Sequence, residues 1–159
     1  MNGPRPLQAL TLHRPWSILV AKGIKKIENR TWHPEPLVQP GEWFAIHAGK
    51  TYDTGCSPMA ARLGVPMQTF FDAPSNSPGC IVAVVRYAGY TRASDDPWFF
   101  GPNYLGWLLD RAVEIDPVPC RGAQKLWRVP SEIANQVRAG YLRAVQLERE
   151  MRGEGPAGG

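Results

Sequence analysis

A cluster of charged side chains near the start of the chain has residue types suited to binding phosphate or nucleobases. Within six residues stand Lys25, Lys26, Glu28 and Arg30. The planar guanidinium of Arg30 can pair with phosphate oxygens or a base edge, which a lysine ammonium cannot do in the same way. Glu28 can orient Arg30, accept a hydrogen bond from an exocyclic amine or act as a base, and neighbouring cations favour its ionised form.

The same cluster also fits a solvated edge strand, because edge strands often carry lysine to prevent aggregation. If residues 25–32 are extended, alternate side chains share a face, so Glu28 lies between Lys26 and Arg30. Two tryptophans, Trp16 and Trp32, flank the segment. Aromatic rings among cations suit stacked bases and phosphates, although each ring also suits a core. We therefore predict that residues 23–30 form a site for RNA or a nucleotide-like fragment.

The elements that must position this site are short. Pro15 suits the first turn of a helix, and Gly23 suits the position just beyond its end. The hydrophobic pattern and the turn residues predict further elements. These are strands at 7–12, 25–32, 43–48 (ended by Gly49), 80–90, 108–115 (broken by Pro117 and Pro119) and 125–129, and helices at 58–63 and at 131–152 with Ser131 as N-cap. Because strands and helices do not alternate regularly, we expect an α+β fold built on a small mixed β-barrel with flanking helices.

The composition of the 159 residues agrees with a single folded domain. The net charge of +4 favours polyanions only slightly. Residues 1–6 lack the apolar stretch of a signal peptide and no apolar run is long enough to cross a membrane, so we expect a cytoplasmic protein without membrane contact. The three cysteines form no CxxC pair, and we expect them to be free thiols.

Several segments resemble the ASCH domain family, whose fold is a PUA-like β-barrel. The defining motif is matched by His13-Arg14-Pro15-Trp16 followed by Gly23-Ile24-Lys25-Lys26-Ile27-Glu28-Asn29-Arg30-Thr31-Trp32. Residues 41–47 and 79–85 are similar to two strands of the family, and residues 119–127 to its closing Pro-x-x-Gly-x-x-x-hydrophobic-Trp segment. The resemblance covers roughly residues 7–130 and is strongest to the version of the domain in activating signal cointegrator-1.

The resemblance implies a cleft that binds RNA or other nucleic acid, lined by the helix start and the Lys-x-x-Glu-x-Arg segment. Lys26 stands where members of the family vary between threonine and a cation. Arg14 replaces the glutamine often found before Pro-Trp and adds positive charge near the cleft. The predicted nucleic-acid-binding residues are Arg14, Trp16, Lys25, Lys26, Glu28, Arg30 and His47.

Some similar ASCH proteins are enzymes, which makes Lys25 and Glu28 catalytic candidates. One group hydrolyses the amide of N4-acetylcytidine with a lysine and a threonine, but the threonine position falls on Glu28, and a carboxylate does not simply replace a hydroxyl nucleophile. Another relative is described as a ribonuclease, and Lys25 with Glu28 could in principle serve as base and phosphate stabiliser for attack by a ribose 2′-OH. A nucleic-acid-binding protein, a hydrolase of RNA or N4-acylated cytidine, and a protein-interaction module therefore remain as alternatives.

The rest of the chain supports these expectations without adding a second site. We expect an ASCH domain at 7–130, a C-terminal helix at 131–152 and a flexible tail at 153–159, and we take the chain to be a monomer. An aromatic group, formed by Trp98, Phe99, Phe100, Tyr104 and Trp107, either fills the core or extends the stacking surface. Arg138 and Arg143 are candidates for a longer phosphate track. No metal or cofactor is expected, because no ligand spacing, P-loop or dinucleotide motif is found.

Overall fold

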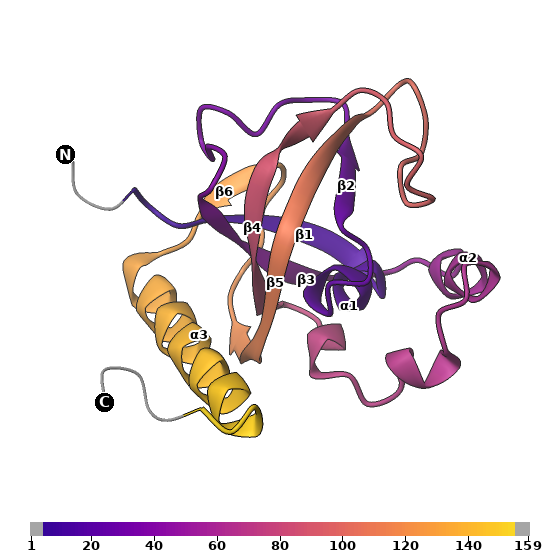
Figure 1. The fold of residues 1–159 in the computed structure, drawn as a ribbon. Coiled ribbons are helices and arrows are strands. Elements are labelled where there is room, and N and C mark those ends of the chain that lie inside the picture. Colours follow the sequence, from indigo (N-terminus) through magenta and orange to yellow (C-terminus); the bar gives the residue numbers. More distant parts are fainter. Residues whose placement is uncertain (1–4, 155–159) are drawn as a thin grey trace.

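The computed structural model describes residues 5–154, in which six strands form one sheet (Figure 1). Along the sheet the strands follow the order β2-β5-β4-β3-β1-β6. The strands are β1 (Gln8–Arg14), β2 (Ile27–Arg30), β3 (Trp43–Tyr52), β4 (Cys80–Thr91), β5 (Leu105–Pro119) and β6 (Leu126–Arg128). The helices are α1 (Trp16–Ala21), α2 (Cys56–Arg62) and α3 (Ser131–Met151), with short 3-10 turns η1 (Met67–Phe70) and η2 (Pro74–Asn76).

The sheet is mixed, because β1 runs parallel to β3 while the remaining neighbours are antiparallel. The predicted α+β class is therefore confirmed. Closure into a barrel is not confirmed, since β2 and β6 are the two ends of the strand order and do not pair within residues 5–154. The residues before and after that range, including positions 1–4 and most of the predicted tail, lie outside the described residues.

Three predicted boundaries are wrong. Gly49 lies inside β3, where an added Cβ would stand 3.0 Å from Thr11 Cγ2, so this glycine permits close approach of β1 instead of ending the strand. Pro117 and Pro119 do not break β5. Pro117 lies near a register shift between β4 and β5, and Pro119 is the last residue of the strand. Ser131 is the first residue of α3 and makes no capping hydrogen bond, since Pro130 occupies the N-cap position.

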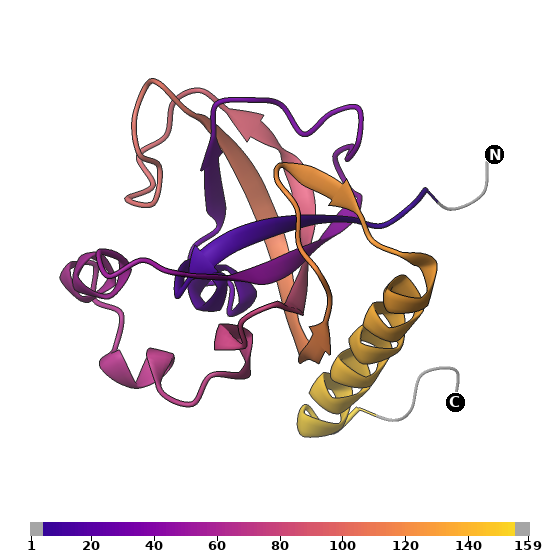
Figure 2. The same cartoon turned by 180° about the vertical axis from the view of Figure 1, so that it is seen from behind.

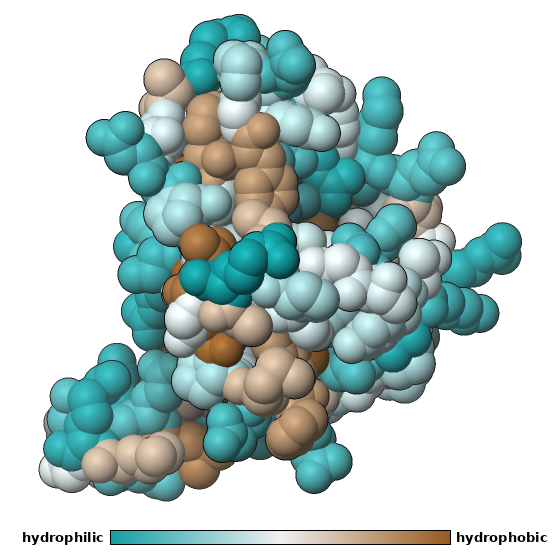
Figure 3. Space-filling view, turned by 90° about the vertical axis from the view of Figure 1, so that its right-hand side faces the viewer, coloured by the Kyte–Doolittle hydropathy of each residue, from teal (hydrophilic) through white to brown (hydrophobic). Residues whose placement is uncertain are grey.

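The two sides of the molecule carry different elements. α3 packs against β5 at the side opposite β2, an arrangement seen from both directions (Figures 1 and 2). Seen from the β2 and α2 side, hydrophobic side chains form a broken band between hydrophilic ones (Figure 3). No helix within residues 5–154 combines the length and apolar character needed to cross a bilayer.

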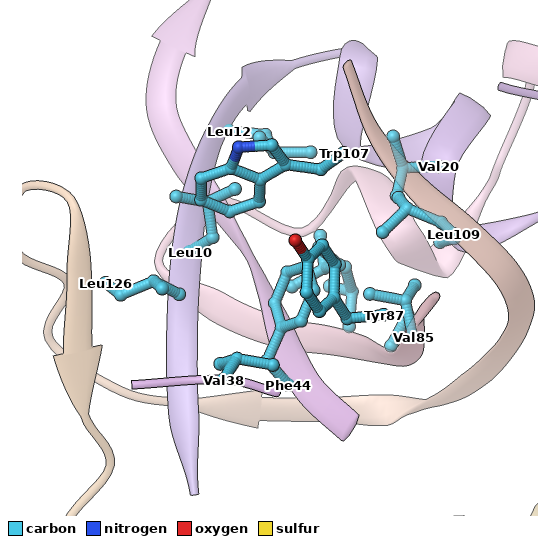
Figure 4. Packing of buried hydrophobic residues seen from close by; sticks show 14 of the residues in the cluster. Leu10, Leu12, Val20, Val38, Phe44, Val85, Tyr87, Trp107, Leu109 and Leu126 are labelled. Carbon is cyan, nitrogen blue, oxygen red and sulfur yellow. The ribbon is translucent and has the colours of Figure 1, made fainter. Parts of the chain in front are cut away.

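The core lies on both faces of the sheet, because five consecutive residues of β4, 81–85, are buried, so both faces of this strand are covered. On one face, Trp107 packs edge-on against Phe44 and Tyr87 (Figure 4). On the other face, α3 covers the sheet with Val137, and Gly140 lets the helix approach Ile115. A core on each face holds β5 rigidly, and β5 in turn fixes its antiparallel neighbour β2, which carries the predicted site.

Candidate functional site

A cleft with a volume of about 270 Å³ opens between the end of β1, the start of α1, β2 and the loop that precedes β5. It contains four of the seven predicted binding residues. Its lining is made by Thr11, Leu12, His13, Trp16, Lys25, Glu28, Asn29, Arg30, Phe100 and Tyr104.

Lys25 reaches this cleft because of the way α1 ends. Gly23 adopts a positive φ of 71°, and the backbone N–H groups of Ile24 and Lys25 both donate to the Leu19 carbonyl, 3.0 Å away. β2 then begins only at Ile27, so Lys25 precedes the strand. Its side chain is 3% exposed, and its Nζ donates to the Ile27 carbonyl and to Glu28 Oε1 at 3.2 Å.

The prediction that Lys26 and Arg30 lie on either side of Glu28 is therefore wrong for Lys26. The two cations on Glu28 are Lys25, on Oε1, and Arg30, whose Nε donates to Oε2 at 2.9 Å. Lys26 is exposed and does not line the cleft. Alternation along a strand cannot apply to Lys26, because residues 25 and 26 lie before the first residue of β2.

The three charged groups form a largely buried cluster with a net charge of +1. The exposed fractions of the side chains are 3% for Lys25, 11% for Glu28 and 27% for Arg30. Because both oxygens of Glu28 accept hydrogen bonds from cations, this carboxylate holds the two cations in place. Charge remains in excess on the cation side, so the cluster suits an anion or a carbonyl oxygen.

Aromatic rings surround the ammonium of Lys25. Its Nζ lies 5.8 Å from the Trp16 ring centroid and 5.6 Å from that of Phe100, and these two rings meet edge-on at 5.9 Å. The indole N–H of Trp16 donates to Asp53 Oδ2 at 2.7 Å, and this hydrogen bond lowers the pKa of Asp53. Asp53 therefore fixes the orientation of the tryptophan that forms one wall of the cleft.

The sequence analysis did not predict four residues that line the cleft, Thr11, Leu12, His13 and Asn29, and of these Asn29 has a clear structural role. Its Nδ2 donates to the Trp98 carbonyl at 2.9 Å, and its Oδ1 accepts from the backbone N–H of Phe100 at 3.0 Å. Phe99 packs closely over Gly106, where an added Cβ would lie 3.0 Å from the Phe99 ring. Asn29 thus holds the loop that presents Phe100. The available signal was an amide among charged residues of the motif, with an aromatic-rich segment elsewhere in the chain.

The predicted aromatic group divides between the two roles considered for it. Trp98 and Trp107 are buried, at 7% and 0% exposure. Phe100 and Tyr104 are 39% and 38% exposed and line the cleft. One part of the group therefore belongs to the interior, and the other offers ring faces to a ligand.

His47 lies outside the cleft, in a chain of hydrogen bonds that joins β1, β3 and the loop before β6. Trp127 Nε1 donates to Thr11 Oγ1 at 3.3 Å, and Thr11 Oγ1 lies 3.1 Å from His47 Nδ1. If Nδ1 accepts from Thr11, Nε2 carries the proton and donates to the Cys120 carbonyl at 2.6 Å. Burial lowers the pKa of His47, which agrees with a neutral ring.

His47 explains why the Pro-x-x-Gly segment of the ASCH-like pattern contains a glycine. An added Cβ on Gly122 would stand 2.7 Å from His47 Cε1 and 2.9 Å from Thr11 Oγ1. No side chain fits there unless the ring moves. The glycine of the Pro-x-x-Gly segment is therefore required by the close approach of its backbone to His47.

The remaining predicted cations lie elsewhere. Arg14 is beside the cleft, where Nε and Nη2 donate to the carbonyls of Gly49 and Lys50, each at 3.0 Å. Arg138 and Arg143 belong to α3, at the opposite side of the molecule from β2 (Figures 1 and 2). The predicted continuation of a phosphate track from the cleft onto these two arginines is therefore wrong, because the sheet separates α3 from the cleft.

Other chemistry is limited within residues 5–154. No three side chains of His, Cys, Asp or Glu come together there as a metal-ligand group. Burial raises the pKa of the Cys56 thiol to about 12, and it also raises the pKa values of Cys80 and Cys120. The thiols are therefore protonated near neutral pH and are poor nucleophiles.

Comparison with known proteins finds similarity in sequence to some and in fold to others. No protein-family model matches the chain. It is 22% identical over 151 residues to activating signal cointegrator 1 of Homo sapiens, covering 84% of this chain and 24% of that protein. It is 28% identical over 124 residues to the DNA gyrase inhibitor of Escherichia coli strain K12, covering 73% and 76%. The ASCH crystal structure from Zymomonas mobilis superimposes with a TM-score of 0.53 at 12% identity, covering 86% of this chain and 96% of that one.

The chain resembles ASCH domain proteins in sequence and in fold. The resemblance read from the motif is thus confirmed by the fold shared with the Zymomonas mobilis ASCH protein and by the sequence similarity to activating signal cointegrator 1. The chain spans only about a quarter of the length of activating signal cointegrator 1. Within this ASCH-like fold, the Lys-x-x-Glu-x-Arg segment supplies the ion cluster of the cleft.

Proposed function

We propose that this ASCH domain, residues 7–130, binds single-stranded nucleic acid, RNA foremost, by seating one nucleotide in the cleft. The observation that carries the proposal is the Lys25–Glu28–Arg30 cluster, which keeps one positive charge in excess beside exposed aromatic rings. Recognition of an unstacked base requires a ring face for stacking and a cation for the phosphate or a carbonyl oxygen. The cleft offers both within one small volume.

The dimensions of the cleft favour one nucleotide over a duplex. Its volume of about 270 Å³ is slightly below the range of roughly 300–1,000 Å³ that is usual for small-molecule sites. Phe100 and Tyr104 offer exposed rings to a base, and Arg30 is the most exposed cation of the cluster. We therefore place the base against the rings and the phosphate toward Arg30, with Lys25 donating from the interior.

The experiment is a titration of fluorescein-labelled single-stranded RNA followed by fluorescence anisotropy, with Arg30→Ala and Arg143→Ala as a matched pair. Both variants remove one arginine, but only Arg30 lines the cleft. We expect Arg30→Ala to weaken binding about 10-fold and to reduce the slope of log K against log salt by about 1. We expect Arg143→Ala to leave the affinity and the slope nearly unchanged. An RNA affinity that changes neither with salt concentration nor with Arg30→Ala would contradict the proposal.

Lys26 has a smaller role in this proposal. Lys26 is exposed next to the cleft, so we expect it to attract the phosphate backbone without a defined contact. Lys26→Ala should therefore weaken RNA binding less than Arg30→Ala at 0.1 M salt, and the difference between wild type and Lys26→Ala should disappear at high salt. We assign His47 no contact with the ligand, because its ring nitrogens are engaged with Thr11 and Cys120.

The geometry supports binding more than hydrolysis. Each oxygen of Glu28 already accepts a hydrogen bond from a cation, so a base role would have to use the remaining lone pairs beside Lys25 and Arg30. The test of a ribonuclease or of an N4-acylcytidine hydrolase is turnover by the purified protein. Product that appears with the wild type and is lost in Glu28→Gln would establish catalysis in this cleft.

A protein partner is a second candidate, favoured by the similarity to the protein named DNA gyrase inhibitor. The decisive measurement is supercoiling by purified gyrase with the wild-type chain and with Arg30→Ala. Inhibition that survives Arg30→Ala would indicate a protein contact outside the cleft. Inhibition lost together with RNA binding would indicate that nucleic-acid binding is responsible.

A further inference from the structure

A second aromatic surface is linked to residues of the cleft by short stretches of backbone. Tyr52, the last residue of β3, is 48% exposed, and the guanidinium carbon of Arg14 lies 5.7 Å from its ring centroid. Arg14 is the register partner of Tyr52 and is anchored by its bonds to the carbonyls of Gly49 and Lys50. We call Arg14 and Tyr52 the shelf.

The shelf is rigidly connected to the wall of the cleft. Arg14 precedes Pro15 and Trp16, and the backbone N–H of Asp53 donates to the Arg14 carbonyl. Asp53, the residue after Tyr52, also accepts the indole N–H of Trp16 at 2.7 Å. His13, which lines the cleft, is adjacent to Arg14 in β1. Two short stretches of backbone therefore connect the shelf with the cleft: residues 13–16, and residues 52–53 through the hydrogen bond of Asp53 with Trp16.

The guanidinium of Arg14 still has donors available for a ligand. Two of its five N–H groups bond to the backbone of β3, and the other three have no partner among residues 5–154. The exposed ring of Tyr52 offers a stacking face, and a neighbouring arginine pairs well with phosphate oxygens. An exposed aromatic ring and a neighbouring arginine supply the two contacts, stacking and charge, that proteins use to bind single-stranded nucleic acid.

We propose that the shelf binds the nucleotide next to the one in the cleft, so that the protein recognises a single strand of at least two nucleotides and not a free nucleoside. Tyr52 stacks on the second base, and Arg14 contacts the phosphate that joins the two. This inference rests on the proposed function of the cleft. It adds to it a second subsite and a minimum ligand length.

The test compares ligands of one and two nucleotides by isothermal titration calorimetry. The probes are the four ribonucleoside 5′-monophosphates and the corresponding 5′-phosphorylated homodinucleotides, with the deoxy forms in parallel to separate RNA from DNA. For the wild type we expect the best dinucleotide to bind about 10-fold more tightly than its mononucleotide, because one stacked base is added. Tyr52→Ala should remove this gain and leave mononucleotide affinity unchanged. Tyr52→Phe should keep it, because the ring is retained.

Each other result has a defined meaning. If dinucleotides bind no more tightly than mononucleotides, or if Tyr52→Ala weakens both equally, the shelf is not a second subsite, although the cleft still binds. If neither length binds the wild type, the proposed function of the cleft falls together with the shelf. Thermal unfolding of Tyr52→Ala shows whether the variant is folded, and Arg14→Gln, which keeps the bulk but not the charge, provides a second probe of the same gain.

Discussion

Replacing the two most buried members of the ion cluster, one at a time and together, should reveal an asymmetry that follows from its connectivity. Lys25 has Glu28 as its carboxylate partner, whereas Glu28 is shared with Arg30. Glu28→Leu leaves the ammonium of Lys25, which is 3% exposed, without a counter-charge. Removal of one partner from a buried pair typically costs about 3–5 kcal/mol, and we expect Glu28→Leu to lie in this range.

Lys25→Met should cost less. Glu28 then loses one bond but keeps Arg30, so the cost is that of one under-satisfied buried acceptor, about 1–3 kcal/mol. In the double variant Lys25→Met/Glu28→Leu, apolar side chains replace the pair, and such replacements are often nearly neutral. Arg30 loses its partner but is 27% exposed and can be hydrated. The double variant should therefore be more stable than Glu28→Leu alone.

Urea unfolding followed by tryptophan fluorescence measures these free energies, provided that the slope m stays constant across the series. The coupling between the two positions should be about 2 kcal/mol in the double-mutant cycle. Additive effects, or a cost below about 1 kcal/mol for Glu28→Leu, would refute the reasoning. Such results would mean that water reaches Lys25 Nζ and screens it, contrary to the burial seen here.

Three further predictions concern the residues that support the cleft. Burial lowers the pKa of His47 below its ordinary 6.5, so on acidification the unfolded chain binds the extra proton before the folded chain does. The stability that the neutral ring contributes should therefore be complete above pH 6.5 and decrease as the pH falls through the lowered pKa. Urea unfolding at pH 7.5 and at pH 5 should show a weaker pH dependence of stability in His47→Gln than in the wild type. Gly122→Ala should destabilise the protein by about 1–3 kcal/mol, because its Cβ would clash with His47 and Thr11, and thermal unfolding no different from wild type would contradict this packing. Asn29→Asp keeps the acceptor for the Phe100 N–H but places a carboxylate, in place of a donor, against the Trp98 carbonyl. This should displace Phe100 from the cleft and lower RNA affinity about 10-fold in an anisotropy titration. Asn103→Asp, an exposed substitution with the same change of charge, is the control, and equal effects of the two variants would show that charge alone is responsible.

Local signals were sufficient for most of the elements. The β-branched run of residues 80–90 predicted β4, and Pro15 with Gly23 predicted a helix between them, because these effects depend on nearest neighbours along the chain. The same signals failed at Gly49 and at the two prolines of β5. At those positions the outcome depends on how closely a neighbouring strand approaches and on where the register shifts, and neither is a local property.

The sequence alone predicted that Lys25, Glu28 and Arg30 lie together, because they stand within six residues of one motif. Of the two flanking tryptophans, Trp16 lines the cleft, whereas Trp32 packs against Trp107 in the core. Only the tertiary structure decided which cations hold Glu28, since the start of β2 at Ile27 turns Lys25 inward and leaves Lys26 exposed. It also decided that the loop after Trp98 is fixed by Asn29 and that α3 lies away from the cleft. Spacing along the chain specifies which side chains a site contains, whereas their partners are set by strand pairing and packing between segments far apart in sequence.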